Sequence, residues 1–114
     1  GLKLYVDDDG NDGLEYNTRV VGRLDILAQD ERGGFVVIEL KVSRGVDAVV
    51  GQVLRYMGWI RHHLADGADV RGVVVVQRAS QKLRYAAVEV RSVEVMEYAL
   101  ALTLSPATPV SGLG

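Results

Sequence analysis

The sequence predicts an α/β fold in which a mixed central β-sheet carries one long helix on a face. Two β-forming runs, 19–29 and 35–42, flank a turn-forming DERGG segment at 30–34, which is the pattern of an antiparallel hairpin. Helical periodicity follows, and then a continuous apolar run at 71–77, which is typical of a buried parallel strand. Strand, helix and buried strand in this order predict a crossover unit, and therefore a sheet with both parallel and antiparallel pairs.

The remaining elements follow from local pattern. Residues 2–6 are expected to form a short first strand, and the acidic stretch 7–13 a solvated loop. The long helix is expected to end at Asp66-Gly67, and Asp47 suits its first turn because a carboxylate there meets the positive end of the helix dipole. Its apolar residues recur at helical spacing: Val46, Val49, Val50, Val53, Leu54, Met57, Ile60 and Leu64.

The C-terminal quarter predicts a short helix, a strand and a tail. Residues 80–87 are expected to be helical, and 93–104 alternate apolar and polar residues in the manner of a late strand. The last ten residues contain two prolines and small side chains. We therefore expect one domain at 1–104 and a flexible tail at 105–114.

Composition limits the function classes. The 114 residues are 48% hydrophobic and 25% charged, which suits one globular domain. No apolar run is long enough to cross a membrane and no signal-peptide pattern opens the sequence, so we expect a cytoplasmic protein. Cysteine is absent, which excludes disulfides and thiolate metal sites. A net charge of −2 argues against binding nucleic acid by bulk charge, although carboxylates that hold a cation remain compatible with a nuclease.

Candidate chemistry begins at Glu39-Leu40-Lys41. Residues two apart in a strand point to the same side, so Glu39 and Lys41 are expected to project together. Their neighbours Val36, Ile38 and Leu40, together with Val42, are expected to face the core. Two charged side chains within so apolar a run are unusual, because Lys and Glu are rarely buried unless they are paired.

The hairpin brings a second carboxylate to this point. If its turn centres on Arg32, Gln29 pairs with Phe35 and Asp25 falls opposite Glu39, with Cβ atoms about 4.5–5.5 Å apart. A slip of one residue would send Asp25 to the other face. In the expected register the two carboxylates would share a hard cation, Mg²⁺ or Mn²⁺, with the backbone carbonyl of Leu40 as a further ligand.

The side chains around this pair suit phosphate chemistry. A bound cation would lower the pKa of a water and polarise a phosphate oxygen. Lys41 would stabilise negative charge at phosphorus or orient the attacking water. On the long helix a stripe of side chains lies beside the apolar residues, and Gln52 and Tyr56 in it are expected to look toward the charged face of the hairpin. The stripe consists of Gln52, Tyr56, Trp59 and His63.

These motifs resemble the PD-(D/E)xK nuclease superfamily. Gly22-Arg23-Leu24-Asp25 followed by Glu39-Leu40-Lys41 matches its core pattern, and Gln52 and Tyr56 match the Q-x-x-x-Y element of its RecB-like branch. The strings GRLDILAQD, VVIELKVSRG and VVGQVLRYMGWI are most similar to the nuclease domain of NucS-type endonucleases, and with the less certain VRGVVVV the likeness covers most of the chain.

The resemblance implies a restriction-endonuclease-like core and Mg²⁺- or Mn²⁺-dependent DNA cleavage. It implies Asp25, Glu39 and Lys41 as the central site, with Gln52 and Tyr56 beside them. Members of the branch place an acidic residue or His upstream, for which Glu15 is the candidate metal ligand. The basic residues proposed to contact DNA are Arg23, Arg44 and Arg55.

Several alternatives stay open. The charged residues would also suit a surface salt-bridge cluster, a nuclease fold that binds DNA or protein without cutting, or a nuclease acting on RNA or modified DNA. Trp59 is interpreted as a packing residue. The DNA-binding region that precedes the nuclease domain in NucS-type enzymes is missing here, so DNA selection is expected to depend on a missing or separate domain. A homodimer is also considered, with 93–104 as the contact edge.

Overall fold

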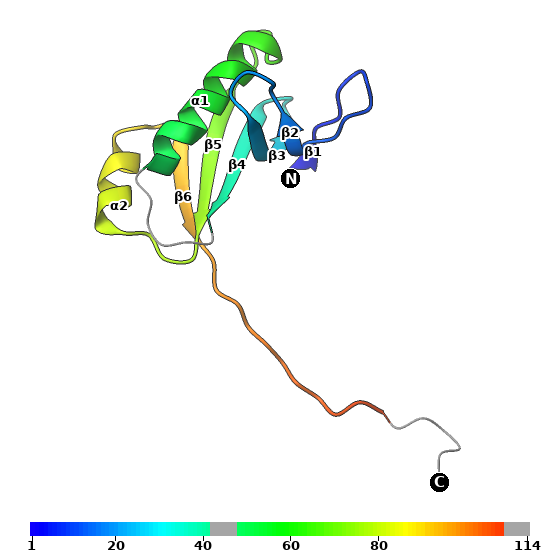
Figure 1. Ribbon diagram of the computed structural model, residues 1–114, viewed down its shortest axis with the longest axis vertical. Helices are drawn as coiled ribbons and strands as arrows, with labels where there is room; N and C mark the ends of the chain where they lie inside the picture. Colours follow the sequence, from blue (N-terminus) through cyan, green and yellow to red (C-terminus); the bar gives the residue numbers. More distant parts are fainter. Residues whose placement is uncertain (42–47, 109–114) are drawn as a thin grey trace.

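The computed structural model describes residues 1–41 and 48–108, and in these ranges it forms one mixed sheet with two helices (Figure 1). The strands β1, β3, β4, β5 and β6 follow one another across the sheet, and β2 also pairs with β3. The elements in chain order are β1 (Lys3–Leu4), β2 (Leu14–Asn17), β3 (Arg23–Gln29), β4 (Phe35–Lys41), α1 (Ala48–His63), β5 (Val70–Val76), α2 (Gln81–Val88) and β6 (Val93–Glu97).

The predicted hairpin and crossover are both present. β3 and β4 are antiparallel, and Gln29 pairs with Phe35 as the turn position predicts. After α1 the chain returns in β5, which is parallel to β4, and β6 is parallel to β5. The sheet is therefore mixed, and α1 connects two adjacent parallel strands.

Helix α1 packs against the sheet through the apolar residues that its periodicity singled out. Among them Val53, Met57 and Ile60 are fully buried. Gly72 on β5 allows the close approach, because a Cβ at this position would lie 2.8 Å from Sδ of Met57 and 3.0 Å from Cγ2 of Val53. The predicted contributions of Val46 and Asp47 lie outside the described residues.

The prediction of which hairpin face meets the core was wrong. Phe35 and Val37 belong to the main core with the residues of α1, whereas Val36 belongs to a small cluster on the other face, against which Ile38 packs. Leu40 is 47% exposed. The crossover places α1 on the face of the odd-numbered β4 residues, so Glu39 lies on the helix side of the sheet.

Three strands also differ from expectation. The first strand is only Lys3–Leu4, and β2 was not predicted. The late strand ends at Glu97 instead of continuing to residue 104. The N–H of Tyr98 still donates to the carbonyl of Val76, the last residue of β5, and beyond it no neighbouring strand offers partners among the described residues. Residues 99–108 therefore run away from the sheet in extended conformation (Figure 1).

The short helix α2 forms where expected. Ser80 caps it by accepting a hydrogen bond from the N–H of Leu83, which satisfies one of the free donors of the first turn. Within 1–41 and 48–108, no helix combines the length and apolar character needed to cross a membrane.

Candidate active site

Asp25 and Glu39 meet where the β3–β4 hairpin stops pairing. The ladder runs from Gln29 and Phe35 to Ile26 and Ile38, so Asp25 and Glu39 are the first residues beyond it. At this level, hydrogen bonds from backbone N–H groups to carboxylate side chains replace the backbone–backbone hydrogen bonds of the ladder. The N–H of Asp25 donates to Oε1 of Glu39 at 3.2 Å, and the N–H of Leu40 donates to Oδ2 of Asp25 at 2.8 Å. Each carboxylate is thereby held against the opposite strand.

An irregularity in β3 frees Asp25 for this arrangement. Leu24 and Leu27 both belong to the main core, although residues three apart in a regular strand face opposite sides. On the other edge of β3, pairs from Leu14 and Tyr16 bracket Glu15 and Asp25, which themselves do not pair. Glu15 has a φ of 48°, outside the range of ordinary strands. Both edges of β3 thus leave regular pairing at the level of Asp25, as at a β-bulge.

Glu39 is a carboxylate buried within the fold. Its residue is 1% exposed. Burial raises the pKa of Glu39 to about 7, and the charge of Asp25 adds to the rise, whereas the Asp25 N–H and the Lys41 ammonium oppose it. The buried negative charge is therefore poorly compensated by the chain's own groups. A divalent cation at the two carboxylates would supply the missing positive charge.

The carboxylate oxygens suit Mg²⁺ or Mn²⁺, which can keep part of its water shell, better than an ion whose ligands must all come from the protein. Among the described residues, no group of three or more His, Cys, Asp or Glu side chains is placed to hold a metal. Glu15, which is exposed on β2, is therefore not gathered with Asp25 and Glu39 into such a group. Two carboxylates nevertheless suffice for Mg²⁺, which usually keeps several waters and takes further oxygens from substrate phosphate.

Lys41 and Tyr56 flank the pair. Lys41 is half-buried at the end of β4 and lies close enough for its charge to lower the pKa of Glu39. It forms no ion pair with a carboxylate in the described part of the chain. The Tyr56 hydroxyl donates to the carbonyl of Arg23 at 2.8 Å, which fixes the start of β3 two residues before Asp25.

Gly22 makes room for the tyrosine. Its φ is 121°, and a Cβ here would lie 3.2 Å from the Tyr56 hydroxyl oxygen. Gln52 lies one turn before Tyr56 on α1 and is half-buried, but its side chain forms no hydrogen bond with another described residue. Of the proposed DNA contacts, Arg23 and Arg55 are exposed, and Arg44 lies outside the described residues.

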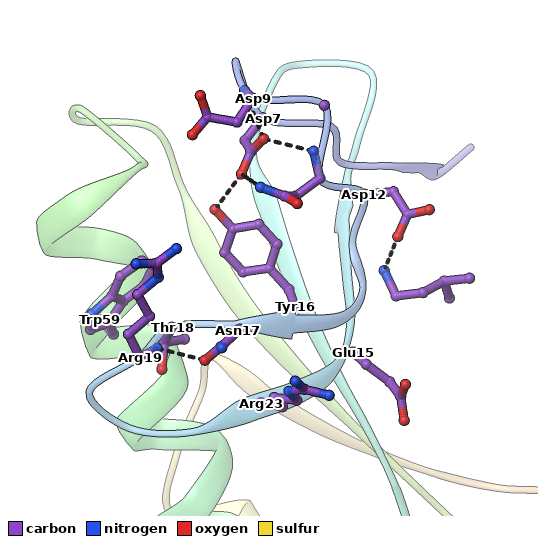
Figure 2. A pocket seen from close by; sticks show the side chains of 13 residues that line it. Asp7, Asp9, Asp12, Glu15, Tyr16, Asn17, Thr18, Arg19, Arg23 and Trp59 are labelled. Carbon is purple, nitrogen blue, oxygen red and sulfur yellow. Dashed lines mark hydrogen bonds between the residues drawn. The ribbon is translucent and has the colours of Figure 1, made fainter.

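Sequence reasoning missed a polar cleft beside this pair. It has a volume of about 880 Å³, and its lining includes Glu15 on β2 and Arg23, two residues before Asp25 on β3 (Figure 2). Asp9, Arg19 and Trp59 line it as well, whereas Asp25, Glu39 and Lys41 do not. The cleft therefore adjoins the carboxylate pair without containing it.

A buried threonine fixes the turn that presents Arg19 to the cleft. Thr18 is 2% exposed. Its hydroxyl donates to the carbonyl of Gly22 at 2.7 Å and accepts from the N–H groups of Val21 and Gly22. The Asn17 side chain accepts from the N–H of Arg19 at 2.8 Å. Asn17, Thr18 and Gly22 are the sequence signals from which this turn could have been predicted.

Comparison with known proteins gives a consistent result. A family model described as the endonuclease NucS C-terminal domain matches residues 13–102. The chain is 35% identical over 63 residues to the endonuclease NucS of Methanopyrus kandleri, covering 55% of this chain and 24% of that protein. The chain thus spans about a quarter of this relative.

Solved structures share the fold. A repair endonuclease from Pyrococcus abyssi superposes with a TM-score of 0.67 at 24% identity, over 86% of this chain and 38% of that one. A complex of EndoMS with double-stranded DNA gives 0.63 at 23% identity, over 86% and 36% of the two chains. EndoMS without DNA gives 0.56 at 26% identity, over 68% and 32%.

Proposed function

Because the chain belongs to the endonuclease NucS C-terminal domain family, we propose that it is a DNA endonuclease domain that needs Mg²⁺ or Mn²⁺. The observation that carries the proposal is that each carboxylate accepts a hydrogen bond from a backbone N–H of the opposite hairpin strand. Glu39 accepts from Asp25, and Asp25 accepts from Leu40. We assign the site to the RecB-like branch of the PD-(D/E)xK superfamily and the sheet to its restriction-endonuclease-like core. The mixed sheet with α1 between β4 and β5 supports this assignment.

Asp25 and Glu39 would hold the cation, with the Leu40 carbonyl as a further ligand and Glu15 as a candidate from the neighbouring strand. When bound, the cation would supply positive charge at the scissile phosphate and acidify water. The hairpin itself orients both carboxylates, because the N–H groups of Asp25 and Leu40 bind them directly.

The surrounding residues would position the substrate. Lys41 projects from the same face of β4 as Glu39, so its ammonium would stabilise charge that develops on the phosphate. Tyr56 would keep Asp25 in place through the Arg23 carbonyl, and Gln52 extends that helix face. Arg23 and Arg55, with Arg44, would contact backbone phosphates.

DNA is the proposed substrate because one relative of this fold is a repair endonuclease and another is seen with double-stranded DNA. The chain spans less than half the length of these relatives, so we assign the choice of DNA structure to a separate domain or partner. A homodimer and a cytoplasmic location are part of the proposal. The exposed leucines Leu100, Leu102 and Leu104 would suit a contact between copies.

A second candidate is a DNA-binding module with the nuclease fold and no cleavage. It is favoured by one observation, that no three-carboxylate group is formed in 1–41 and 48–108. Such a module would bind DNA without a cation at Asp25 and Glu39. Cleavage and cation binding therefore separate the two candidates.

The test is a cleavage assay of the purified chain with Mn²⁺ on single-stranded, duplex, mismatched and branched DNA, and on RNA. At least one DNA form is expected to be cut. Lys41→Ala is expected to lower the rate by about 100-fold or more, the usual cost of losing one charge-stabilising donor. Lys82→Ala, an exposed lysine on α2, is the matched control and should cut like the parent.

Two results would overturn the proposal. One is that no DNA form is cut by a folded protein with Mn²⁺. The other is that Lys41→Ala cuts as fast as Lys82→Ala. Cleavage of RNA alone would support the proposed active site but would change the proposed substrate from DNA to RNA.

A further inference from the structure

The loop from β5 to α2 lies at the edge of the sheet where β4 also ends (Figure 1). Lys41, the last residue of β4, pairs with Val76, the last residue of β5. Arg78 follows Val76 by two residues, so its Cα lies within about 12 Å of that of Lys41, one strand spacing plus the reach of two residues. Arg78 and the proposed active site therefore share the carboxyl edge of the parallel strands, where ligands usually bind in open α/β sheets.

The backbone next to Arg78 is held by side chains of α2 and β6. The N–H of Ala79 donates to Oε2 of Glu97 at 2.8 Å, and Nε of Arg84 donates to the Ala79 carbonyl at 3.5 Å. Arg84 and Glu97 also form an ion pair at 3.3 Å. Ala79 itself is 8% exposed. The residue after Arg78 is therefore buried and bound on both its backbone groups, so the loop presents Arg78 from a fixed position.

The Arg78 side chain has no partner within the described residues. It is exposed, and it forms no ion pair with a carboxylate of 1–41 or 48–108. Arg84 differs, because its guanidinium already binds Glu97 and the Ala79 carbonyl. A guanidinium offers a planar fork of donors that matches the oxygens of a phosphate. Arg78 is thus a cation fixed near Lys41 and available to an anion.

We propose that Arg78 binds a backbone phosphate of the DNA strand that occupies the active site, and that Glu97 is its positioning residue, acting through Ala79. The proposal rests on the proposed function, which makes DNA the substrate at Asp25 and Glu39. Successive phosphates of one strand advance about 3.4 Å along the helix axis. A phosphate within a few nucleotides of the one at Lys41 therefore comes within reach of the long Arg78 side chain. Such a contact fixes the strand and reads no base.

Salt dependence of DNA binding tests the role of Arg78. Two labelled duplexes of unrelated sequence are titrated without a divalent cation, and binding is followed by fluorescence anisotropy over a range of salt concentrations. Arg78→Gln should weaken binding of both duplexes about tenfold at low salt, the low end of the loss of a hydrogen bond to a charged group. The slope of log affinity against log salt should fall by about one, the value for one phosphate contact.

Arg71→Gln is the matched control. Arg71 is exposed on the same strand but at its start, so it lies at the opposite edge of the sheet and its loss changes the net charge equally. This variant should bind like the parent. An equal loss of affinity in both variants would mean that binding follows net charge alone, which overturns the assignment to Arg78.

Two variants of Glu97 test the positioning role. Glu97→Ala and Glu97→Gln remove the same negative charge, so charge alone predicts that both bind DNA more tightly than the parent. Only glutamine keeps an acceptor for the Ala79 N–H. We therefore expect Glu97→Ala to bind about threefold more weakly than Glu97→Gln, in line with the loss of one hydrogen bond. Circular dichroism shows whether both are folded, and equal binding by the two folded variants overturns the positioning role.

The outcomes are distinguishable from those of the cleavage proposal. Unchanged affinity and salt slope in Arg78→Gln, or no binding of either duplex by the folded parent at low salt, overturns the phosphate contact whatever the cleavage assay gives. A loss confined to Arg78→Gln supports it even if Lys41→Ala leaves cleavage intact, because binding is measured without the cation. In the cleavage assay, Arg78→Gln should raise KM and leave kcat near that of the parent, whereas Lys41→Ala should lower kcat.

Discussion

At the scale of single residues, the burial of the Glu39 carboxylate lowers the stability of the fold. An isolated buried carboxylate is unfavourable unless it is paired or neutral. Here it accepts a hydrogen bond from the backbone N–H of Asp25, a residue that is itself acidic. Retaining an acid at a 1% exposed position is easier to explain by a bound cation than by stability, and this is the physical basis of the proposed metal site.

The pKa of Glu39 predicts how stability changes with pH. The pKa is raised from 4.5 to about 7 by burial and then by the charge of Asp25. The unfolded chain therefore loses this proton first, so the stabilisation from the neutral carboxyl is present below pH 4.5 and is lost as pH rises through about 7. The loss is on the order of 3 kcal/mol relative to Glu39→Gln, which does not titrate.

Urea unfolding of both proteins at about pH 5 and about pH 8 measures this difference. The parent should lose stability relative to Glu39→Gln at the higher pH, and Mn²⁺ should restore part of the loss. Parallel stability curves for the two proteins would show that Glu39 is not desolvated as the structure indicates.

Tyr56 gives a second prediction at this scale. Tyr56→Phe removes the hydrogen bond to the Arg23 carbonyl and should destabilise the fold by about 1 kcal/mol. Cleavage should fall as well, since the start of β3 would be less firmly held. Tyr85→Phe, at a 72% exposed tyrosine on α2, should match the parent in both assays. Identical unfolding of the two variants would argue against the anchoring role.

At the scale of elements, the sequence pattern predicted the features that depend on local chemistry, such as turns and strand register. The DERGG turn fixed the register from Gln29 and Phe35, and the register brought Asp25 to Glu39. The core-facing side of β4 was predicted wrongly, because both faces of this strand are apolar and only the position of α1 decides between them. The strand at Leu14–Asn17 was missed because it is short and its pairing with β3 is interrupted at Glu15.

The cleft could not be predicted from local sequence pattern either. It gathers residues from the β1–β2 loop, the turn at 18–22 and α1, and no sequence spacing relates Asp9 to Arg19 or Trp59. The prediction of the late strand failed for another reason. Its alternation of apolar and polar residues continues to Leu104, but β5 stops at Val76. A strand forms only where a neighbour offers backbone partners.

Packing of β2 on β3 gives a prediction at the element scale. The carbonyl of Gly13 accepts from the N–H of Leu27 at 2.7 Å, and a Cβ on Gly13 would overlap the Leu27 carbonyl oxygen. Gly13→Ala should therefore destabilise the fold by about 2 kcal/mol or more. Gly58→Ala is the matched control. Its Cβ meets nothing within 4 Å on α1, and the change should stabilise by up to about 1 kcal/mol.

Thermal unfolding followed by circular dichroism measures both alanine variants. Equal effects of the two substitutions would mean that β2 does not lie as close to β3 as described. Loss of β2 would also remove Glu15 and one wall of the cleft.

At the scale of the whole molecule, the charge balance bears on how tightly the proposed endonuclease domain binds DNA. The net charge is −2, whereas DNA-binding domains that act alone usually carry a basic face. The relatives are more than twice as long as this chain. Weak DNA binding by the isolated chain, improved by a divalent cation, is therefore expected.

The central claim is that Asp25 and Glu39 together hold the cation on which cleavage depends. Isothermal titration of the chain with Mn²⁺ above pH 7, where Glu39 is ionised, tests it most directly. We predict one binding event that disappears in both Asp25→Asn and Glu39→Gln and persists in the control Asp8→Asn. Absence of binding in the folded parent, or unchanged binding in Asp25→Asn and Glu39→Gln, would contradict the account.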